Sequence, residues 1–216
     1  SPVCAQDDPL TQQLHSALDR LRAAGANISE VARPNLDFEH YHHVYLLLLR
    51  ATTGTILSES EFQDHLEGAR LRSVSDHSYR AHIDRGVSLH YKQWWHLHNE
   101  REKFRIEWKR FFSDYDILLC PVAASTAFPH DHGGERPDRT IPINGKPEAV
   151  VDQLFWAGIT TLARLPSSVI PVGTAADNLP CGLQIITDYL EDYTALEFAG
   201  LAEQTLGGFV PPSGFH

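Results

Sequence analysis

Apolar positions near the start of the chain predict a helix between two strands. Leucines recur at helical spacing over residues 10–21, after the helix-start signal Asp7-Asp8-Pro9, and Gly25 is placed to end this helix. Residues 2–5 form a short apolar run, and residues 28–31 alternate between apolar and polar side chains, as strands do. A helix, a glycine and a strand in this order predict a right-handed crossover within an α/β sheet.

The middle of the chain, residues 37–113, has the pattern of a mainly helical subregion. Helices are expected over residues 38–50, 59–71 and 87–112. Short runs that are apolar on both faces predict strands inside a covered sheet, over residues 117–120, 169–172 and 182–186. Residues 125–147 are rich in Pro, Gly, His and Asp and predict a long surface loop.

No repeat, low-complexity tract or linker divides the sequence. Residues 1–216 therefore predict one domain, or part of one, of the α/β class, with a mixed β-sheet flanked by helices. With 216 residues, 42% hydrophobic and 21% charged, the composition is that of a globular protein with a core.

Net charge and cysteine content limit the kinds of partner and the cellular compartment that we expect for this chain. A net charge of −10 opposes binding to nucleic acid or anionic lipid. The apolar run at residues 44–49 is too short to span a bilayer, and no secretory signal pattern is present. Three scattered cysteines (Cys4, Cys120 and Cys181) suit a reducing compartment, so we expect a cytoplasmic location.

Histidines are the first candidates for chemistry. His40 and His43 share a predicted helix, His96 and His98 bracket a leucine, and His130-Asp131-His132 lies in the predicted loop. Imidazole pairs of this kind can ligate zinc, but a zinc site needs a third and a fourth ligand at suitable spacing. None is evident, and thirteen histidines make neighbours by chance, so we predict no metal and no other cofactor.

The sequence also offers no convincing nucleophile and base. Cys120 and Cys181 each adjoin a proline at an apolar strand end, where a thiol is more often a small core residue. A lysine base must be desolvated, and Lys92, Lys103, Lys109 and Lys146 all lie in polar contexts. We therefore predict no catalytic residue in this chain.

Several segments in the second half resemble one enzyme family. These are Asp114–Val122, with its strand ending on a proline, then Phe155-Trp156-Ala157-Gly158, Leu165-Pro166, Val169–Gly173, Pro180–Gln184 and the Asp192 helix start. In this order they resemble the C-terminal part of amidase-signature hydrolases. The resemblance is strong from Phe112 onward and weak over residues 2–71.

The resemblance implies the hydrolysis of carboxylic amides by a serine nucleophile, a second serine and a lysine, with a Gly-rich oxyanion loop. In that family these groups come from the first half of the domain, and neither the lysine nor the Gly/Ser-rich motif is found here. The resemblance therefore implies the non-catalytic portion, which completes the sheet and lines the substrate cleft. The cleft residues it implies are Pro121, Val122, Ala123, Trp156, Thr160, Thr161 and Arg164. Trp156 precedes Gly158, so we expect it just before a turn rather than within a regular apolar stripe.

Two departures from the family pattern leave the amide substrate open, because Thr161 and Arg164 stand where many members carry asparagine and glycine. The expected partners are a small-molecule amide, the missing N-terminal half and a further copy of this chain. A non-catalytic binding or scaffold protein derived from an amidase remains an alternative, as does a metal-dependent hydrolase built on the histidines.

Overall fold

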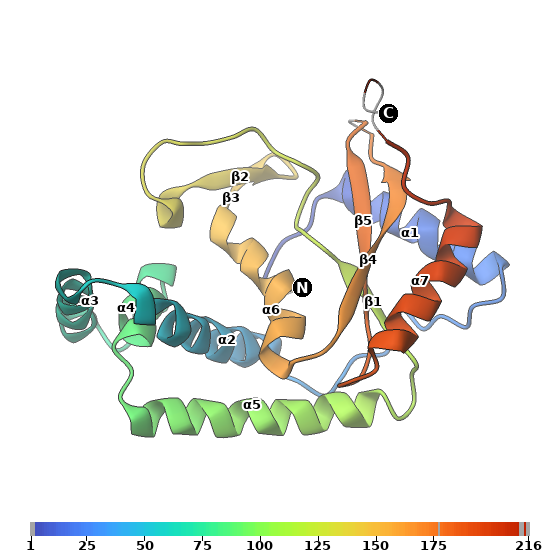
Figure 1. Ribbon diagram of the computed structural model, residues 1–216. Helices are drawn as coiled ribbons and strands as arrows, with labels where there is room; N and C mark the ends of the chain where they lie inside the picture. Colours follow the sequence, from blue (N-terminus) through green and yellow to red (C-terminus); the bar gives the residue numbers. More distant parts are fainter. Residues whose placement is uncertain (1–2, 177, 212–213, 215–216) are drawn as a thin grey trace.

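The computed structural model describes residues 3–176, 178–211 and 214 (Figure 1). The helices are α1 (Asp8–Ala23), α2 (Phe38–Thr53), α3 (Glu59–Leu71), α4 (Tyr79–Val87), α5 (Tyr91–Phe111), α6 (Leu154–Ala163) and α7 (Asp192–Leu206). The strands are β1 (Leu118–Pro121), β2 (Thr140–Ile143), β3 (Lys146–Ala149), β4 (Ser167–Thr174) and β5 (Pro180–Ile186). Short 3-10 turns are η1 (Gly54–Ile56), η2 (Arg136–Asp138) and η3 (Val150–Gln153).

The main sheet has the strand order β1-β5-β4, and both of its pairings are antiparallel. The strands predicted over residues 117–120, 169–172 and 182–186 correspond to β1, β4 and β5. The strand predicted at residues 28–31 is wrong, and with it the crossover, because this segment pairs with no strand among the described residues. Residues 3–5 form no strand either, and Pro2 lies outside the described residues.

Two helix layers flank this sheet. Helices α1 and α7 cover one face, where Leu14 and Leu21 share a buried cluster with Leu183 and Ile185 of β5. Helices α2, α5 and α6 lie on the other side, where Ile186 joins the second and larger cluster. The alternation of side chains along β5 therefore divides the core in two and fixes the α/β class.

The second face of the sheet is only partly covered, which differs from the prediction of strands buried on both faces. Val169 of β4 is 55% exposed and Val122, just after β1, is 37% exposed. Both side chains lie within 3.3 Å of the position that a Cβ of Gly182 would occupy, so they form one apolar patch. The helices on this side pack near Ile186 and leave this end of the sheet open.

Helices α2 to α5 occupy Phe38–Phe111, with the long α5 running beneath α2 and α6 in Figure 1. Sequence patterns predict the N-termini of α2 and α3 well. The Asp37 side chain accepts from the backbone N–H groups of Glu39 and His40, and Ser58 forms a capping box with Glu61. The helix predicted to run from Val87 instead starts at Tyr91, and the separate helix α4 was missed.

Two further predictions need correction. The expected loop at residues 125–147 contains η2 and most of the hairpin β2–β3, whose turn is Asn144-Gly145 with φ values of 51° and 75°. An Asn-Gly turn is a strong hairpin signal, but Pro142 and Pro147 hid it by suggesting a loop. Trp156, expected before a turn, lies within helix α6.

Candidate functional site

A large hollow adjoins the free edge of β1 and has a volume of about 950 Å³. We call it the β1 groove. Its floor is Ile117–Pro121, and its far rim is the extended segment at residues 26–36. One wall comes from α1 and α7, and the opposite wall from α5, α6 and the start of α2. The apolar wall residues are Leu14, Leu18, Phe198 and Leu201 on the first side and Phe38, Phe111, Phe155, Trp156 and Ile159 on the second.

The backbone of β1 gives this groove its chemical character. In the described part of the chain β1 pairs with β5 alone, so its other edge presents N–H and C=O groups to the groove. The walls project past this edge on both sides, since residues of both helix layers line the same hollow. The arrangement favours an extended apolar segment that can bond to the backbone of β1.

Of the predicted cleft residues, Pro121 and Trp156 line the β1 groove together. Val122 and Trp156 lie on the same side of the sheet, because Val122 adjoins Gly182 while Trp156 packs with Ile186, and alternate residues of β5 share a face. Ala123 is half-buried just beyond Val122.

The other three predicted residues occupy the C-terminal part of α6 and the turn after it. The hydroxyls of Thr160 and Thr161 both donate to the carbonyl of Ala157, at 3.3 and 2.8 Å. Arg164 follows the helix, roughly 12 Å along its axis from Trp156 at 1.5 Å per residue. The helix therefore separates residues that a turn would have kept together, and their role in a cleft stays a prediction.

Burial suppresses the reactivity of two thiols. It raises the pKa of Cys4 to about 11, with the nearby Asp152 carboxyl adding to the effect. It raises the pKa of Cys120 to about 12. Neither sulfur is a thiolate near neutral pH, so neither has the form that attacks a carbonyl. The four lysines are all exposed and lack the apolar surroundings of a lysine base.

The histidines form pairs. His43 Nδ1 lies 2.8 Å from His82 Nε2 across α2 and α4, and the rings of His130 and His132 are 5.9 Å apart. Among the described residues, no group of three or more His, Cys, Asp or Glu side chains could hold a metal ion. The His43–His82 pair was not foreseen, because it joins residues 39 positions apart.

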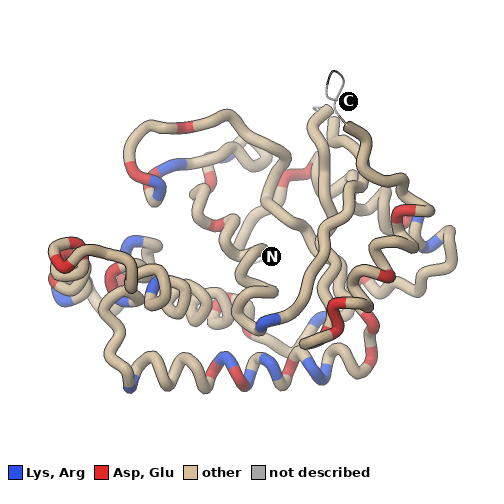
Figure 2. Tube along the Cα trace, in the orientation of Figure 1, with Lys and Arg blue, Asp and Glu red and all other residues tan. Residues whose placement is uncertain are grey.

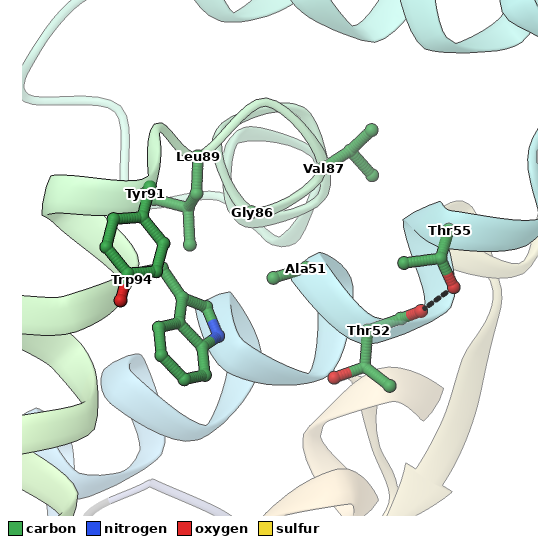
Figure 3. Close-up of a pocket in the computed structure, with 8 residues that line it drawn as sticks. All are labelled: Ala51, Thr52, Thr55, Gly86, Val87, Leu89, Tyr91 and Trp94. Atoms are coloured by element: carbon green, nitrogen blue, oxygen red, sulfur yellow. Dashed lines mark hydrogen bonds between the residues drawn. The ribbon is translucent and has the colours of Figure 1, made fainter.

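A smaller hollow of about 440 Å³ lies between α2, α4 and the start of α5 (Figure 3). Its lining is Ala51, Thr52, Thr55, Gly86, Val87, Leu89, Tyr91 and Trp94. Both threonine hydroxyls donate to backbone carbonyls, Thr52 to Leu48 and Thr55 to Thr52. No carboxylate, imidazole or cationic side chain is among these lining residues, so this hollow carries no evident chemistry.

The fold defines an α/β protein in which helix layers flank an antiparallel sheet, whose edge strands in the described residues are β1 and β4. The chain belongs to the amidase family, since a family model described as Amidase matches residues 1–196. Among curated proteins, it is 25% identical over 211 residues to one component of the glutamyl-tRNA(Gln) amidotransferase of Maricaulis maris. It is 26% identical over 209 residues to an indoleacetamide hydrolase from Bradyrhizobium diazoefficiens.

These alignments cover 90% and 93% of this chain but only 40% and 36% of those relatives. A crystal structure of an amidase aligns with a TM-score of 0.69 at 24% identity, covering 94% of this chain and 43% of that one. A bacterial aryl acylamidase of the amidase signature family aligns with a TM-score of 0.66 at 17% identity, covering 94% and 41%. The chain thus spans about two-fifths of the proteins it resembles and shares their fold.

No helix in the described residues combines the length and the apolar character needed to cross a bilayer.

Proposed function

We propose that this chain is the C-terminal part of an amidase domain that hydrolyses carboxylic amide C–N bonds. In this proposal residues 1–216 complete the sheet of that domain and one side of its substrate cleft. Family membership supports the amide chemistry, as do the names of relatives such as indoleacetamide hydrolase. The coverage of about two-fifths of each relative supports the partial domain.

One observation carries the proposal: β1 ends the sheet at the floor of an apolar groove whose two walls extend beyond it. An edge strand of a finished domain is usually short, charged or covered. β1 is short, with four residues, but these are apolar and uncharged, and helices of both layers extend beyond them. We therefore assign the β1 groove to a strand from the remainder of the amidase domain.

The cleft wall in this proposal consists of Pro121, Val122, Ala123, Trp156, Thr160, Thr161 and Arg164. The shared sheet face of Val122 and Trp156 supports the first four of these residues. The serines, the lysine and the oxyanion donors would come from the remainder, so the chain alone is expected to lack amidase activity.

A hybrid enzyme tests the proposal. The matched region of the Bradyrhizobium indoleacetamide hydrolase is replaced by this chain, and the hybrid is assayed for order by circular dichroism and for turnover of a panel of simple amides. We expect the isolated chain to hydrolyse none of them and the hybrid to be ordered and to hydrolyse some. If the isolated chain hydrolysed an amide, and a substitution within this chain abolished that activity, the proposal that the catalytic groups lie in the remainder of the domain would be refuted.

Two leucines of α7 allow a matched test of whether the β1 groove receives a strand. Leu201 lines the β1 groove and is 56% exposed, whereas Leu196 is 58% exposed and does not line it. Leu201→Arg places a charge against the incoming strand and should prevent assembly of the hybrid, while Leu196→Arg should leave it ordered. If the two substitutions affected assembly of the hybrid equally, the proposal that a strand occupies the β1 groove would be contradicted.

A further inference from the structure

Three arginine side chains gather where α5 meets the turn between α6 and β4. Arg101 and Arg105 lie on α5, in the part of that helix where charges of both signs alternate in Figure 2, and Arg164 follows α6. The carboxylate among them is Glu102. Arg105 donates to it at 2.6 Å, and Arg101 and Arg164 lie 3.9 and 3.8 Å from its other oxygen.

The positive charge of this cluster is not balanced. Three guanidinium groups face one carboxylate, and the side chains of Arg101 and Arg105 are only 17% and 23% exposed. The Nε–H groups of both residues and Oε1 of Glu102 are buried without a hydrogen-bond partner, while Nη2 of Arg101 lies 2.6 Å from His98 Nδ1. Burial, and then the neighbouring charge of Arg164, lowers the pKa of Arg101. A half-buried cation is stabilised by an opposite charge, so a second anion would stabilise the cluster.

The backbone at this place is also unusual. Arg164 has φ 60° and ψ 39°, the left-handed conformation that glycine normally supplies at the end of a helix. Leu190 has φ 67°, and its neighbour Tyr189 lies 4.4 Å beneath the guanidinium of Arg105. Left-handed residues other than glycine are uncommon and gather at functional sites. In this conformation Arg164 reaches the other two arginines.

We propose that Arg101, Arg105 and Arg164 bind one oxyanion, the phosphate or carboxylate group of a small ligand. Planar guanidinium groups match such oxygens in pairs, and the side chain of Arg164, 44% exposed, presents its N–H groups to an incoming ligand. The chain as a whole carries a net charge of −10, which disfavours nonspecific binding of anions to the rest of its surface. None of the three residues lines the β1 groove. Arg164 also belongs to the proposed cleft wall, but the inference rests on the charges and distances within the cluster and does not need that role.

The test is calorimetric titration of the full chain with inorganic phosphate and, in a second arm, with acetate, each at constant ionic strength set with chloride. Saturable binding in the phosphate arm identifies a phosphate site, and saturable binding in the acetate arm identifies a carboxylate site. Arg164→Gly removes one guanidinium and suits the left-handed backbone, so it should fold. It should weaken binding by roughly tenfold or more, as the loss of one charge-assisted hydrogen bond does.

Arg110→Gln is the matched control, because Arg110 is on the same helix and pairs with Glu107 outside the cluster. It loses the same charge and should bind as tightly as the unmodified chain. The proposal is overturned if neither anion binds saturably, or if Arg164→Gly and Arg110→Gln weaken binding equally. Either result would indicate that the three arginines form a surface ion-pair network without an anion site.

Discussion

At the scale of single residues, Gly86 allows α4 to lie directly against α2. A Cβ at this position would be 2.9 Å from the carbonyl oxygen of Leu47 and would also meet Arg50 Cβ. We predict that Gly86→Ala lowers the free energy of unfolding by about 1–3 kcal/mol, the usual cost of overpacking. Urea unfolding followed by circular dichroism measures the change.

Gly200 on α7 is the control for this substitution, since a Cβ there would meet no atom within 4 Å. Gly200→Ala should raise the free energy of unfolding by about 0.5–1 kcal/mol, because alanine restricts the unfolded chain more than glycine does. If Gly86→Ala stabilised the protein like Gly200→Ala, the close packing of α4 on α2 would be refuted.

The His43–His82 pair makes stability depend on pH. Burial, then the neighbouring His82, lowers the pKa of His43 to about 4, and burial lowers the pKa of His82. His40, His77 and Arg85 also oppose protonation of His43. Between about pH 4 and pH 6.5 the unfolded chain therefore binds more protons than the folded one. The contribution of the pair is fully present above about pH 6.5 and is lost as the pH falls toward 4.

The direction of this pH dependence gives a second prediction. His43→Gln should flatten the dependence of the unfolding free energy on pH between about 4 and 6.5, because one of the titrating groups is removed. Denaturant titrations at several pH values measure the pH dependence of the unfolding free energy in the parent chain and in His43→Gln. An unaltered slope in His43→Gln would mean that this imidazole titrates alike in both states.

At the scale of elements, the hairpin β2–β3 is tied to the start of α1 through its turn. The side-chain oxygen of Asn144 accepts from the backbone N–H of Asp8, and its backbone N–H donates to Asp7, both at 2.8 Å. Its amide also donates to the carbonyl of Gln6 at 3.2 Å. One residue therefore supplies the turn conformation, with φ 51°, and caps a helix that is distant in sequence.

Substitutions at Asn144 separate these two roles. Asn144→Gly keeps the left-handed backbone and loses the side-chain bonds, so it should lower the free energy of unfolding by about 1–2 kcal/mol. Asn144→Ala should cost about 1 kcal/mol more, because a Cβ strains the left-handed conformation. Thermal unfolding of the two variants measures the difference. Asn144→Gly as stable as the parent would mean that the tie to α1 contributes nothing.

At the scale of the whole molecule, the β1 groove and the patch of Val122 and Val169 are apolar surfaces that water meets directly. Exposed strand edges and apolar patches favour association. We predict that the purified chain forms a dimer or a larger species, and that Leu201→Arg shifts it toward the monomer more than Leu196→Arg does. Size-exclusion chromatography with light scattering measures this, and a single 24.2 kDa species at all concentrations would contradict it.

The sequence by itself determined the family, the α/β class and the positions of the regular elements with strong local signals. The leucine repeat of α1, the capped starts of α2 and α3 and the apolar strands β1, β4 and β5 could all be predicted, because each follows from the spacing of neighbouring residues. Local sequence signals were not sufficient where strand formation depends on pairing with another strand. Residues 28–31 alternate like a strand but pair with no strand in the described part of the chain. The strands β2 and β3 form in a proline-containing stretch because the Asn144-Gly145 turn brings one beside the other.

Only the tertiary structure decided which residues meet. The family resemblance implied that Trp156 and Arg164 line one cleft, which stays a prediction. The structure shows that they lie near opposite ends of α6 and that Arg164 is close to Arg101 and Arg105. The groove beside β1, the His43–His82 pair and the arginine cluster all join residues far apart in the chain. The periodicity of a sequence reports which face of an element is buried, whereas the neighbour across that face depends on how the elements pack.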